Sequence, residues 1–340
     1  MEPSEYKPLF DLRQTERMIR VIKEFFQTNL AEALNLLRVS APLFVPADTG
    51  INDNLNGVEM PISFAVKALN GQRAEIVQSL AKWKRMALAD YGFSPGEGLY
   101  TDMNAIRPDE IIDETHSIYV DQWDWERVMA PGERNLDFLC WIVERIYGVI
   151  RLTELRVAET QPAITPILPE RIEFVHSLEL EKLWPDCSPR EREDRICREK
   201  KAVFIIGIGA ALANGKPHDG RAPDYDDWST PTPRGPGLNG DIFVWNPVLE
   251  RGFELSSMGI RVDAESLRRQ LAITNTQERA KLLFHRRLLA GELPQTIGGG
   301  IGQSRLCMFF MRKSHVGEVQ CSIWPAELRE QLRRRNVTLL

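Results

Sequence analysis

The segment Gly298-Gly-Gly-Ile-Gly-Gln-Ser-Arg305 constrains the fold of this chain more than any other feature. Glycines at 298, 300 and 302 would leave one face of a strand without side chains, so that a flat ring or a phosphate could approach the backbone. The apolar residues after Arg305 predict a helix, and a cation beside a helix N-terminus is suited to bind phosphate. A glycine-rich turn with a surface arginine explains the spacing equally well. No Gly-Lys-Ser/Thr follows, so the segment is not a P-loop.

Apolar periodicity predicts the main helices and strands. Residues 18–30 and 135–158 have apolar side chains every three or four positions, which is typical of amphipathic helices. Ser79 is the expected N-cap of a third helix that runs through Leu88 and ends at Gly92. Strands are expected at residues 43–45, 203–208 and 242–248. This grouping predicts an α+β fold with a largely antiparallel sheet flanked by helices, in a single domain over residues 1–340 with tails at 1–14 and 326–340.

Composition and cysteine usage argue against several classes of protein. The chain has 43 Lys plus Arg and 48 Asp plus Glu, a net charge of −5, whereas nucleic-acid binders are usually basic. The longest apolar run, residues 202–213, is too short to cross a bilayer, and the acidic, polar start does not resemble a secretion signal. Five scattered cysteines without C-x-x-C spacing indicate reduced thiols and no structural zinc. We therefore expect a cytoplasmic protein with neither nucleic acid nor membrane as partner.

The helix expected after Ser79 carries an unusual lysine. Lys84 lies on the same face as Leu80 and Trp83, where a lysine is costly unless it reaches solvent or meets an anion. The pattern therefore favours a carboxylate or phosphate partner for Lys84. Lys82 and Arg85 point elsewhere and are expected to be solvated.

Residues 117–125 read as a strand with one polar face. Strand alternation groups Gln122, Asp124 and Glu126 with Val120, and places the aromatic residues Trp123 and Trp125 on the other face. Such a polar face could recognise an ammonium or amide group, or it could simply face solvent. The pattern alone does not decide between these two interpretations.

Two loop regions also carry candidate chemistry. Residues 217–238 are rich in Pro, Gly and Asp, and a loop of this length tends to be functional. The hairpin expected around Glu250-Arg-Gly252 has Asp241 and Glu254 near its ends, which could hold Mg²⁺ or could be solvated. A near-match to a dinucleotide fingerprint at Gly207 lacks its third glycine, so close packing of a strand end is expected there.

These segments occur together in one known family. The chain closely resembles the aspartate–ammonia ligases, the ammonia-dependent asparagine synthetases, whose fold is that of class II aminoacyl-tRNA synthetases. Residues 17–45, with Pro42, resemble motif 1, the dimer-forming element. Arg107-Pro-Asp-Glu110 with the strand to Trp125 resembles motif 2, and residues 298–305 resemble motif 3. Residues 79–85, 119–128, 221–230 and 253–263 resemble this ligase family in particular, and the resemblance extends over about residues 15–325.

The resemblance implies a two-step reaction that uses ATP and Mg²⁺. The side-chain carboxylate of L-aspartate attacks the α-phosphorus of ATP, which gives β-aspartyl-AMP and pyrophosphate. Ammonia then displaces AMP to give L-asparagine. The implied partners are L-aspartate, ammonia and ATP, and the implied assembly is a homodimer.

The resemblance also implies a role for each matching residue. For ATP it implies Arg107 at the α-phosphate, Arg305 at the γ-phosphate, Arg221, Asp226, Ser257, Gly300 and Gly302 around the nucleotide, and Asp241 with Glu254 at Mg²⁺. For aspartate it implies Lys84 and Arg261 at the α-carboxylate, Ser79 and Asp124 near the ammonium, and Asp53 with Gln122 at the acyl end, where Asp53 would accept a proton from the attacking nitrogen.

One of these roles conflicts with simple strand geometry. Strict alternation puts Glu254 and Ser256 on one face, and Ser257 and Arg261 on the other. A β-bulge near Ser257 or Gly259 would reconcile them.

Three alternative functions agree less well with the sequence. A tRNA-charging synthetase for aspartate or asparagine would place an anticodon-binding barrel before motif 1, which here begins within the first twenty residues. An inactive nucleotide sensor would be expected to lose the charged set, yet Arg107, Asp241, Glu254 and Arg305 are present. A nicotinamide-dependent oxidoreductase would need a glycine where Leu212 stands.

Overall fold

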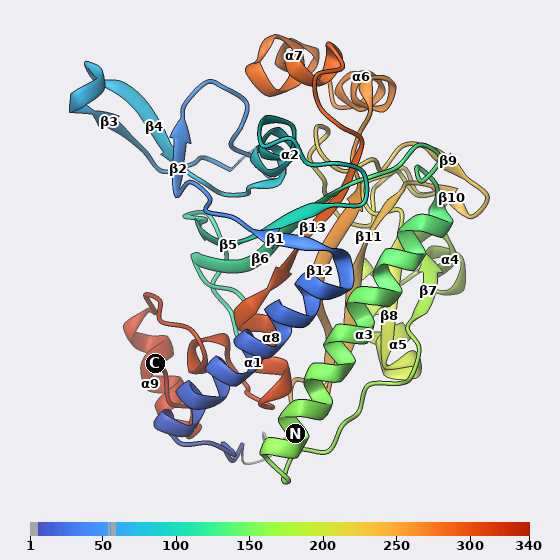
Figure 1. Ribbon diagram of the computed structural model, residues 1–340. Coiled ribbons are helices and arrows are strands. Elements are labelled where there is room, and N and C mark those ends of the chain that lie inside the picture. The colour runs from blue at the N-terminus through green and yellow to red at the C-terminus, as the bar shows by residue number, and fades with distance from the viewer. Residues whose placement is uncertain (1–5, 54, 56–58) are drawn as a thin grey trace.

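The computed structural model describes residues 6–53, 55 and 59–340, and a mixed β-sheet forms its centre (Figure 1). Within those residues the sheet has eight strands, and its neighbours pair antiparallel except for the outermost pair at each edge. The predicted α+β fold with a largely antiparallel sheet is therefore confirmed. In spatial order the strands are β1 (Leu36–Arg38), β5 (Gly98–Ile106), β6 (Tyr119–Val128), β13 (Thr296–Gly302), β12 (Arg251–Ile260), β11 (Asn239–Asn246), β8 (Ala202–Ile206) and β7 (Glu173–His176).

One face of the sheet is apolar and lies under helices. Trp123 and Trp125 of β6 are fully buried in the core, and the ring centroids of Phe26 and Trp123 lie 4.7 Å apart. The covering helices are α1 (Leu12–Leu34), α3 (Leu136–Thr160) and α8 (Gln303–Phe310) (Figure 1). They confirm the helices predicted around residues 18–30 and 135–158 and after Arg305. The alternation of β6 thus sends Trp123 and Trp125 into this core and Gln122, Asp124 and Glu126 to the opposite face, as predicted.

The helix α2 (Ala81–Asp90) packs on that opposite face, against β6 and β13. It starts two residues after Ser79, so the prediction of Ser79 as N-cap was wrong: Leu80 occupies that position without a side-chain hydrogen bond. Ser79 Oγ instead accepts a hydrogen bond from Ala81 N at 3.2 Å. The helix ends before Gly92, as predicted.

Two predicted strands differ from the observed ones at their ends. β8 stops at Ile206 because Gly207 turns the chain with a φ of 78°, and a Cβ there would overlap His176. Gly207 is thus a closely packed strand end, as expected, and not part of a dinucleotide site. β11 begins before the predicted residue 242 and ends before Pro247, which has no N–H for a ladder. β11 and β12 form the predicted hairpin.

The other elements lie around this sheet. None of the helices in the described ranges combines the length and the apolar character needed to cross a bilayer.

The strand predicted at residues 43–45 is displaced by one residue as β2, which belongs to a small antiparallel sheet that extends away from the body (Figure 1). The elements around the central sheet are β2 (Phe44–Pro46), β3 (Ser63–Val66), η1 (Lys67–Leu69), β4 (Gln72–Ile76), α4 (Ser177–Leu183), α5 (Pro189–Lys200), β9 (Pro231–Thr232), β10 (Gly235–Pro236), α6 (Ala264–Ile273), η2 (Gln277–Lys281), α7 (Leu283–Leu289), η3 (Val316–Glu318) and α9 (Ala326–Arg334).

Candidate functional site

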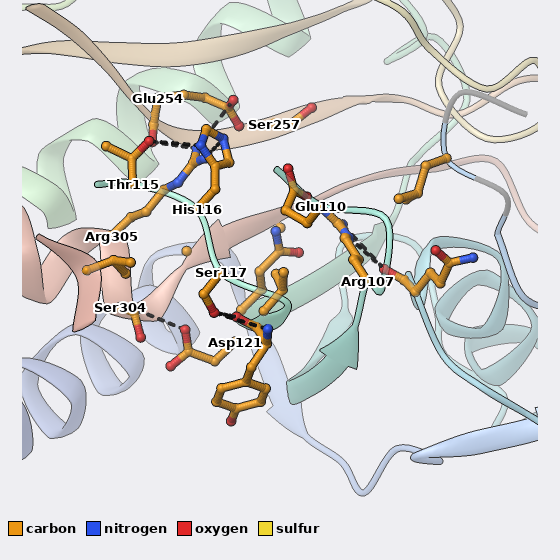
Figure 2. Close-up of a pocket in the computed structure, with 18 of the residues that line it drawn as sticks. Arg107, Glu110, Thr115, His116, Ser117, Asp121, Glu254, Ser257, Ser304 and Arg305 are labelled. Atoms are coloured by element: carbon orange, nitrogen blue, oxygen red, sulfur yellow. Dashed lines mark hydrogen bonds and ion pairs between the residues drawn. The ribbon is translucent and has the colours of Figure 1, made fainter. Parts of the chain in front are cut away.

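A cavity of about 450 Å³ opens on the polar face of the sheet, where β6, β12 and β13 meet the loop that contains Arg221. Many of the residues implied by the family resemblance line it, although they come from distant parts of the chain. Arg305 and His116 lie at one end of this cavity and Arg107 at the other (Figure 2). The predicted residues in its lining are Arg107, Gln122, Arg221, Glu254, Ser257, Gly300, Gly302 and Arg305.

The glycines of β13 allow this strand to lie against the polar side chains of β6. A Cβ at Gly300 would overlap Gln122 Oε1 and lie 2.8 Å from Asp124 Oδ1. A Cβ at Gly298 would overlap the carboxylate of Glu126. The alternating glycines therefore belong to a strand that makes room for polar groups, and the alternative of a glycine-rich turn was wrong.

Arg305 is held in place from two directions. As predicted, it lies in the first turn of α8; its Nη1 donates to Glu254 O at 3.1 Å, and its Nη2 donates to His116 Nε2 at 2.9 Å. His116 Nδ1 lies 2.8 Å from Asp113 Oδ1, so the network assigns the ring proton to Nδ1 and the acceptor lone pair to Nε2. Burial acts to raise the pKa of Asp113, yet hydrogen bonds from His116 and Thr115 hold it below its usual value. The sequence interpretation missed His116. Its position among polar residues immediately before β6 is the sequence feature that could have indicated it.

Arg107 and Asp53 are connected through Gln78. Arg107 donates to Gln78 O from Nε at 3.4 Å and from Nη2 at 3.3 Å. The side chain of Gln78 in turn donates from Nε2 to Asp53 O at 3.1 Å. Gln78 lines the cavity, and its Oε1 is buried without a hydrogen-bond partner within the described ranges.

Asp53 itself is buried next to the cavity and does not line it. Its Oδ1 accepts a hydrogen bond from Leu55 N at 3.2 Å, and its Oδ2 has no partner among the residues that the structure describes. Burial raises the pKa of Asp53 to about 6; the Asp224 carboxylate adds to this increase, and Lys82 and Arg107 oppose it. Asp53 is thus a weakly acidic carboxyl group, one oxygen of which has no partner within residues 6–53, 55 and 59–340.

Lys84 and Arg261 form a buried cluster with carboxylates. Lys84 Nζ lies 3.4 Å from Asp124 Oδ1 and 4.0 Å from Glu126 Oε2, which confirms the predicted anionic partner for this lysine. Arg261 Nη2 donates to Glu126 Oε2 at 2.8 Å, and its Nη1 donates to Asp226. Burial raises the pKa of Asp124 and lowers that of Lys84.

This cluster lies beside the cavity, not in its lining. The structure brings Lys84, Asp124 and Arg261 together around Glu126, whereas the hydrogen bond of Ser79 Oγ is to Ala81 N. Outside the cavity lining are Ser79, Lys84, Asp124 and Arg261, as well as Asp53, Asp226 and Asp241.

The prediction that Lys82 and Arg85 are solvated was wrong. Lys82 is 3 % exposed and Arg85 is 2 % exposed. Arg85 donates to Val262 O at 2.6 Å and to Pro294 O at 2.9 Å, whereas Lys82 Nζ lies 3.4 Å from Asp224 Oδ2. The apolar pattern of α2 indicates one buried face, but the helix is enclosed on several sides, so its charged residues find internal partners.

A β-bulge reconciles Glu254 with Ser257. Along β12, Ser256 pairs with Ile242 and Glu254 pairs with Phe243, so Leu255 is the extra residue. The bulge lies two residues before Ser257, the nearer of the two expected positions, and shifts the alternation, so that Glu254 and Ser257 both line the cavity. It thereby removes the geometric objection to Ser257.

Asp241 and Glu254 could hold a hard cation together with a ligand. Burial raises the pKa of Asp241, and the nearby Glu254 carboxylate adds to this increase, whereas Arg221 opposes it. Asp241 Oδ1 is buried and has no hydrogen-bond partner in the described part of the chain. The described residues contain no group of three His, Cys, Asp or Glu side chains that would hold a metal alone. Mg²⁺ is nevertheless commonly bound by one or two carboxylates together with substrate phosphates, so these two residues fit that ion.

The predicted functional loop is fixed by one glutamine that the sequence interpretation did not identify. Gln270 of α6 is fully buried and donates from Nε2 to Pro223 O and Asp226 O, both at 2.9 Å. Its Oε1 accepts from Trp228 N at 3.0 Å. This arrangement holds the loop beside the cavity, where Arg221 binds both Asp219 and Asp241.

Comparison with solved structures shows which fold this is. The asparaginyl-tRNA synthetase of Pyrococcus horikoshii, complexed with asparaginyl-adenylate, superposes with a TM-score of 0.64 at 15% identity, over 92% of this chain and 70% of that chain. The asparaginyl-tRNA synthetase of Entamoeba histolytica, also with asparaginyl-adenylate, gives a TM-score of 0.62 at 13% identity, over 91% of this chain and 66% of that chain. At such low identity these likenesses show a shared fold alone, and they confirm the predicted class II synthetase-like architecture.

Comparison of sequences shows the family. The aspartate-ammonia ligase of Parabacteroides distasonis is 58% identical over all of this chain and 99% of its own length. That of Bacteroides thetaiotaomicron is 57% identical with the same coverage, and that of Clostridium tetani is 55% identical over 99% of this chain and 97% of its own length. The sequence model of the family described as aspartate-ammonia ligase matches residues 13–336. The chain is an enzyme that belongs to the aspartate–ammonia ligase family.

Proposed function

We propose that this enzyme makes L-asparagine in two steps, through a β-aspartyl-AMP intermediate, with release of pyrophosphate and AMP. The family supports asparagine biosynthesis from aspartate. The observation that carries the finer proposal is the cavity with Arg107 at one end and Arg305 at the other (Figure 2), whose lining includes Gly300 and Gly302 of β13. A polyphosphate needs separated, fixed cations and a close approach to the backbone, and this arrangement offers both.

In the first step the protein binds ATP and stabilises charge at the α-phosphorus. Arg107 contacts the α-phosphate, where charge develops as the aspartate carboxylate attacks, and Arg305 contacts the γ-phosphate. Arg221, Ser257, Gly300 and Gly302 line the nucleotide site, and Asp226 supports it through Arg261. Glu254 and Asp241 would hold Mg²⁺, which would supply charge neutralisation on the phosphates.

Aspartate is recognised by the buried cluster beside the cavity. Lys84 and Arg261 bind the α-carboxylate, and Asp124 with Ser79 binds the ammonium group. Support comes from the geometry, because Lys84 Nζ and Asp124 Oδ1 are only 3.4 Å apart and can contact both ends of one α-amino acid. This orientation directs the side-chain carboxylate toward Arg107.

In the second step ammonia attacks the acyl carbon of the adenylate. A C–N bond forms, the C–O bond to AMP breaks, and the nitrogen loses one proton. We assign the acceptance of this proton to Asp53, whose Oδ2 is buried and free within the described residues. Gln122 lies at the acyl end, on the same strand face as Asp124.

The remaining proposals concern the setting of the enzyme. We propose a homodimer, because β1 is an edge strand and Leu37 on it is exposed. We propose a cytoplasmic location, because all five cysteines are free. We propose one catalytic domain over residues 1–340, because the central sheet combines strands from residue 36 to residue 302.

Mass spectrometry of the products tests the proposed reaction. The enzyme is incubated with ATP, Mg²⁺, aspartate and ammonium, and the expected products are asparagine and AMP in equal amounts. Chelation of Mg²⁺ with EDTA is expected to stop the reaction, and excess Mg²⁺ is expected to restore it. Formation of ADP in place of AMP would contradict the adenylate intermediate, and turnover in EDTA would contradict the metal assignment.

A further inference from the structure

Lys82 is a buried cation between two carboxylates, and the reaction steps above do not use it. Its Nζ lies 3.4 Å from Asp224 Oδ2 and 4.0 Å from Asp53 Oδ1. The three side chains are at most 3 % exposed. Burial of an ammonium group is costly unless opposite charges compensate it, and these two carboxylates provide that compensation.

Asp224 has other hydrogen-bond partners besides Lys82. Its Oδ2 also lies 2.9 Å from His285 Nε2 and 3.3 Å from Arg279 Nη1. Arg279 belongs to η2 and His285 to α7, so Asp224 is also anchored by elements that follow α6 in the chain. Arg279 and His285 thus share the compensation of Asp224 with Lys82, which also faces Asp53.

Asp53 has fewer partners. The titratable and charged groups that face it are Lys82 from α2, Arg107 from the end of β5, and Asp224 and Tyr225 from the loop. Of the two cations, Lys82 has the stronger effect on the carboxylate of Asp53. Lys82 and Leu55 N both face Oδ1, which leaves Oδ2 without a partner among the described residues.

We propose that Lys82 is a positioning residue that keeps Asp53 ionised and holds its Oδ1, so that Oδ2 is free to take the proton from the attacking nitrogen. The proposal rests on the role of Asp53 in the proposed function. Asp224 has the opposite effect, because its negative charge opposes ionisation of Asp53. Lys82 and Asp224 therefore form a pair whose removal should act with opposite signs on the same carboxyl group.

This difference in sign gives the test. Asparagine formation is measured against pH, with the concentration of free ammonia kept constant by adjusting total ammonium. In Lys82→Met, the acidic limb of the profile should move to higher pH by about one unit or more, as expected for loss of an opposite charge at this distance. In Asp224→Asn the limb should move to lower pH. Lys82→Arg should restore a profile close to that of the original enzyme.

Controls separate this effect from general damage. Aspartate-dependent ATP–pyrophosphate exchange reports the first step and should stay within a few-fold in Lys82→Met and Asp224→Asn. Lys200→Met, the same replacement at an exposed lysine, should change neither assay. If Lys82→Met does not fold, Asp224→Asn still gives the direction of the shift, and Lys82→Arg remains the variant expected to show none.

The possible failures are distinguishable. Reduced rates with an unmoved acidic limb in both variants would overturn the role of Lys82 and indicate a structural role only. Retention of asparagine formation and of the acidic limb in Asp53→Asn would instead overturn the assignment of the proton acceptor, on which the proposal rests.

Discussion

Gly298 lies directly against the carboxylate of Glu126: a Cβ at position 298 would overlap Glu126 Oε2 and lie 2.7 Å from Arg261 Nη2. Since Glu126 and Arg261 are both buried and hydrogen-bonded to each other, a methyl group there has to displace one of them. We predict that Gly298→Ala lowers the free energy of unfolding by about 1–3 kcal/mol, the usual cost of overpacking. It should also raise the KM for aspartate, since Arg261 moves. Urea unfolding and steady-state kinetics measure the two effects.

The matched control is Gly148→Ala. Gly148 lies within α3, and no atom outside its own helix lies within 4 Å of a Cβ built there. This replacement should therefore increase stability by about 0.5–1 kcal/mol, because alanine loses less conformational freedom in a helix than glycine. If Gly298→Ala behaves like Gly148→Ala, the close packing of β13 against Glu126 is not a constraint.

Arg107→Ala should abolish adenylate formation and leave the protein folded. The guanidinium makes two long hydrogen bonds to one carbonyl, so its loss costs little stability. Loss of one fixed donor to a developing charge typically reduces the rate about 10²–10³-fold. Aspartate-dependent ATP–pyrophosphate exchange measures this step. Arg333→Ala, at an exposed arginine of α9, is the control, and exchange close to that control would remove Arg107 from the chemistry.

The enzyme should use free ammonia and should not use glutamine. A glutaminase needs a reactive cysteine, and a reactive cysteine needs an exposed, electropositive setting. The first cysteine in the chain is Cys140 in α3, and burial raises the pKa of its thiol to about 11, so it is not a thiolate at neutral pH.

The measurement compares glutamine with ammonium chloride at equal concentration and mildly alkaline pH. Asparagine formation from ammonium should rise with pH as ammonium loses its proton, and a thiol-reactive glutamine analogue should have no specific effect. A comparable rate with glutamine in ammonia-free enzyme would show that a glutaminase is present.

His315 should make the stability of the protein depend on pH. Its Nδ1 accepts a hydrogen bond from Gly317 N at 3.0 Å, and burial lowers its pKa from 6.5 to about 4. In the unfolded chain the imidazole takes up its proton near pH 6.5, so protonation favours unfolding. The contribution to stability is complete above pH 6.5 and is lost as pH falls toward 4, by at most about 3 kcal/mol.

Urea unfolding at pH 7 and pH 4.5 tests this dependence. His315→Asn retains an acceptor for the local turn but cannot titrate, so the difference in unfolding free energy between the two pH values should be smaller than in the original protein. Groups other than His315 contribute equally to both proteins and cancel in the comparison. Equal pH dependence in the two proteins would contradict the role of His315.

The sequence predicted those features that depend on local patterns. Alternation in β6 correctly separated Trp123 and Trp125 from Gln122 and Asp124, since a strand has a period of two wherever it is regular. The same rule failed on β12, where the single extra residue Leu255 shifts the pattern. Nothing in the residue types of that segment marks the position of the bulge.

The features that sequence patterns missed depend on contacts between distant segments. Lys82 looked like a solvated lysine because its partners, Asp53 and Asp224, lie far away in the sequence and meet it only in the folded protein. His116 acquires its role from Arg305, which is 189 positions later. The roles of such residues can be recognised only when the structure shows which distant residues they contact.

The pairing of Arg261 with Glu126 and Asp226 has a consequence for how the enzyme meets its substrate. These internal carboxylates compensate the charge of the buried Arg261 guanidinium when no substrate is bound. In the binding mode proposed above, the α-carboxylate of aspartate competes with these two carboxylates for Arg261, so its affinity reflects only the difference between the two interactions. The site is therefore selective because an anion binds only if its interaction with Arg261 is more favourable than that of Glu126 or Asp226, which it has to displace.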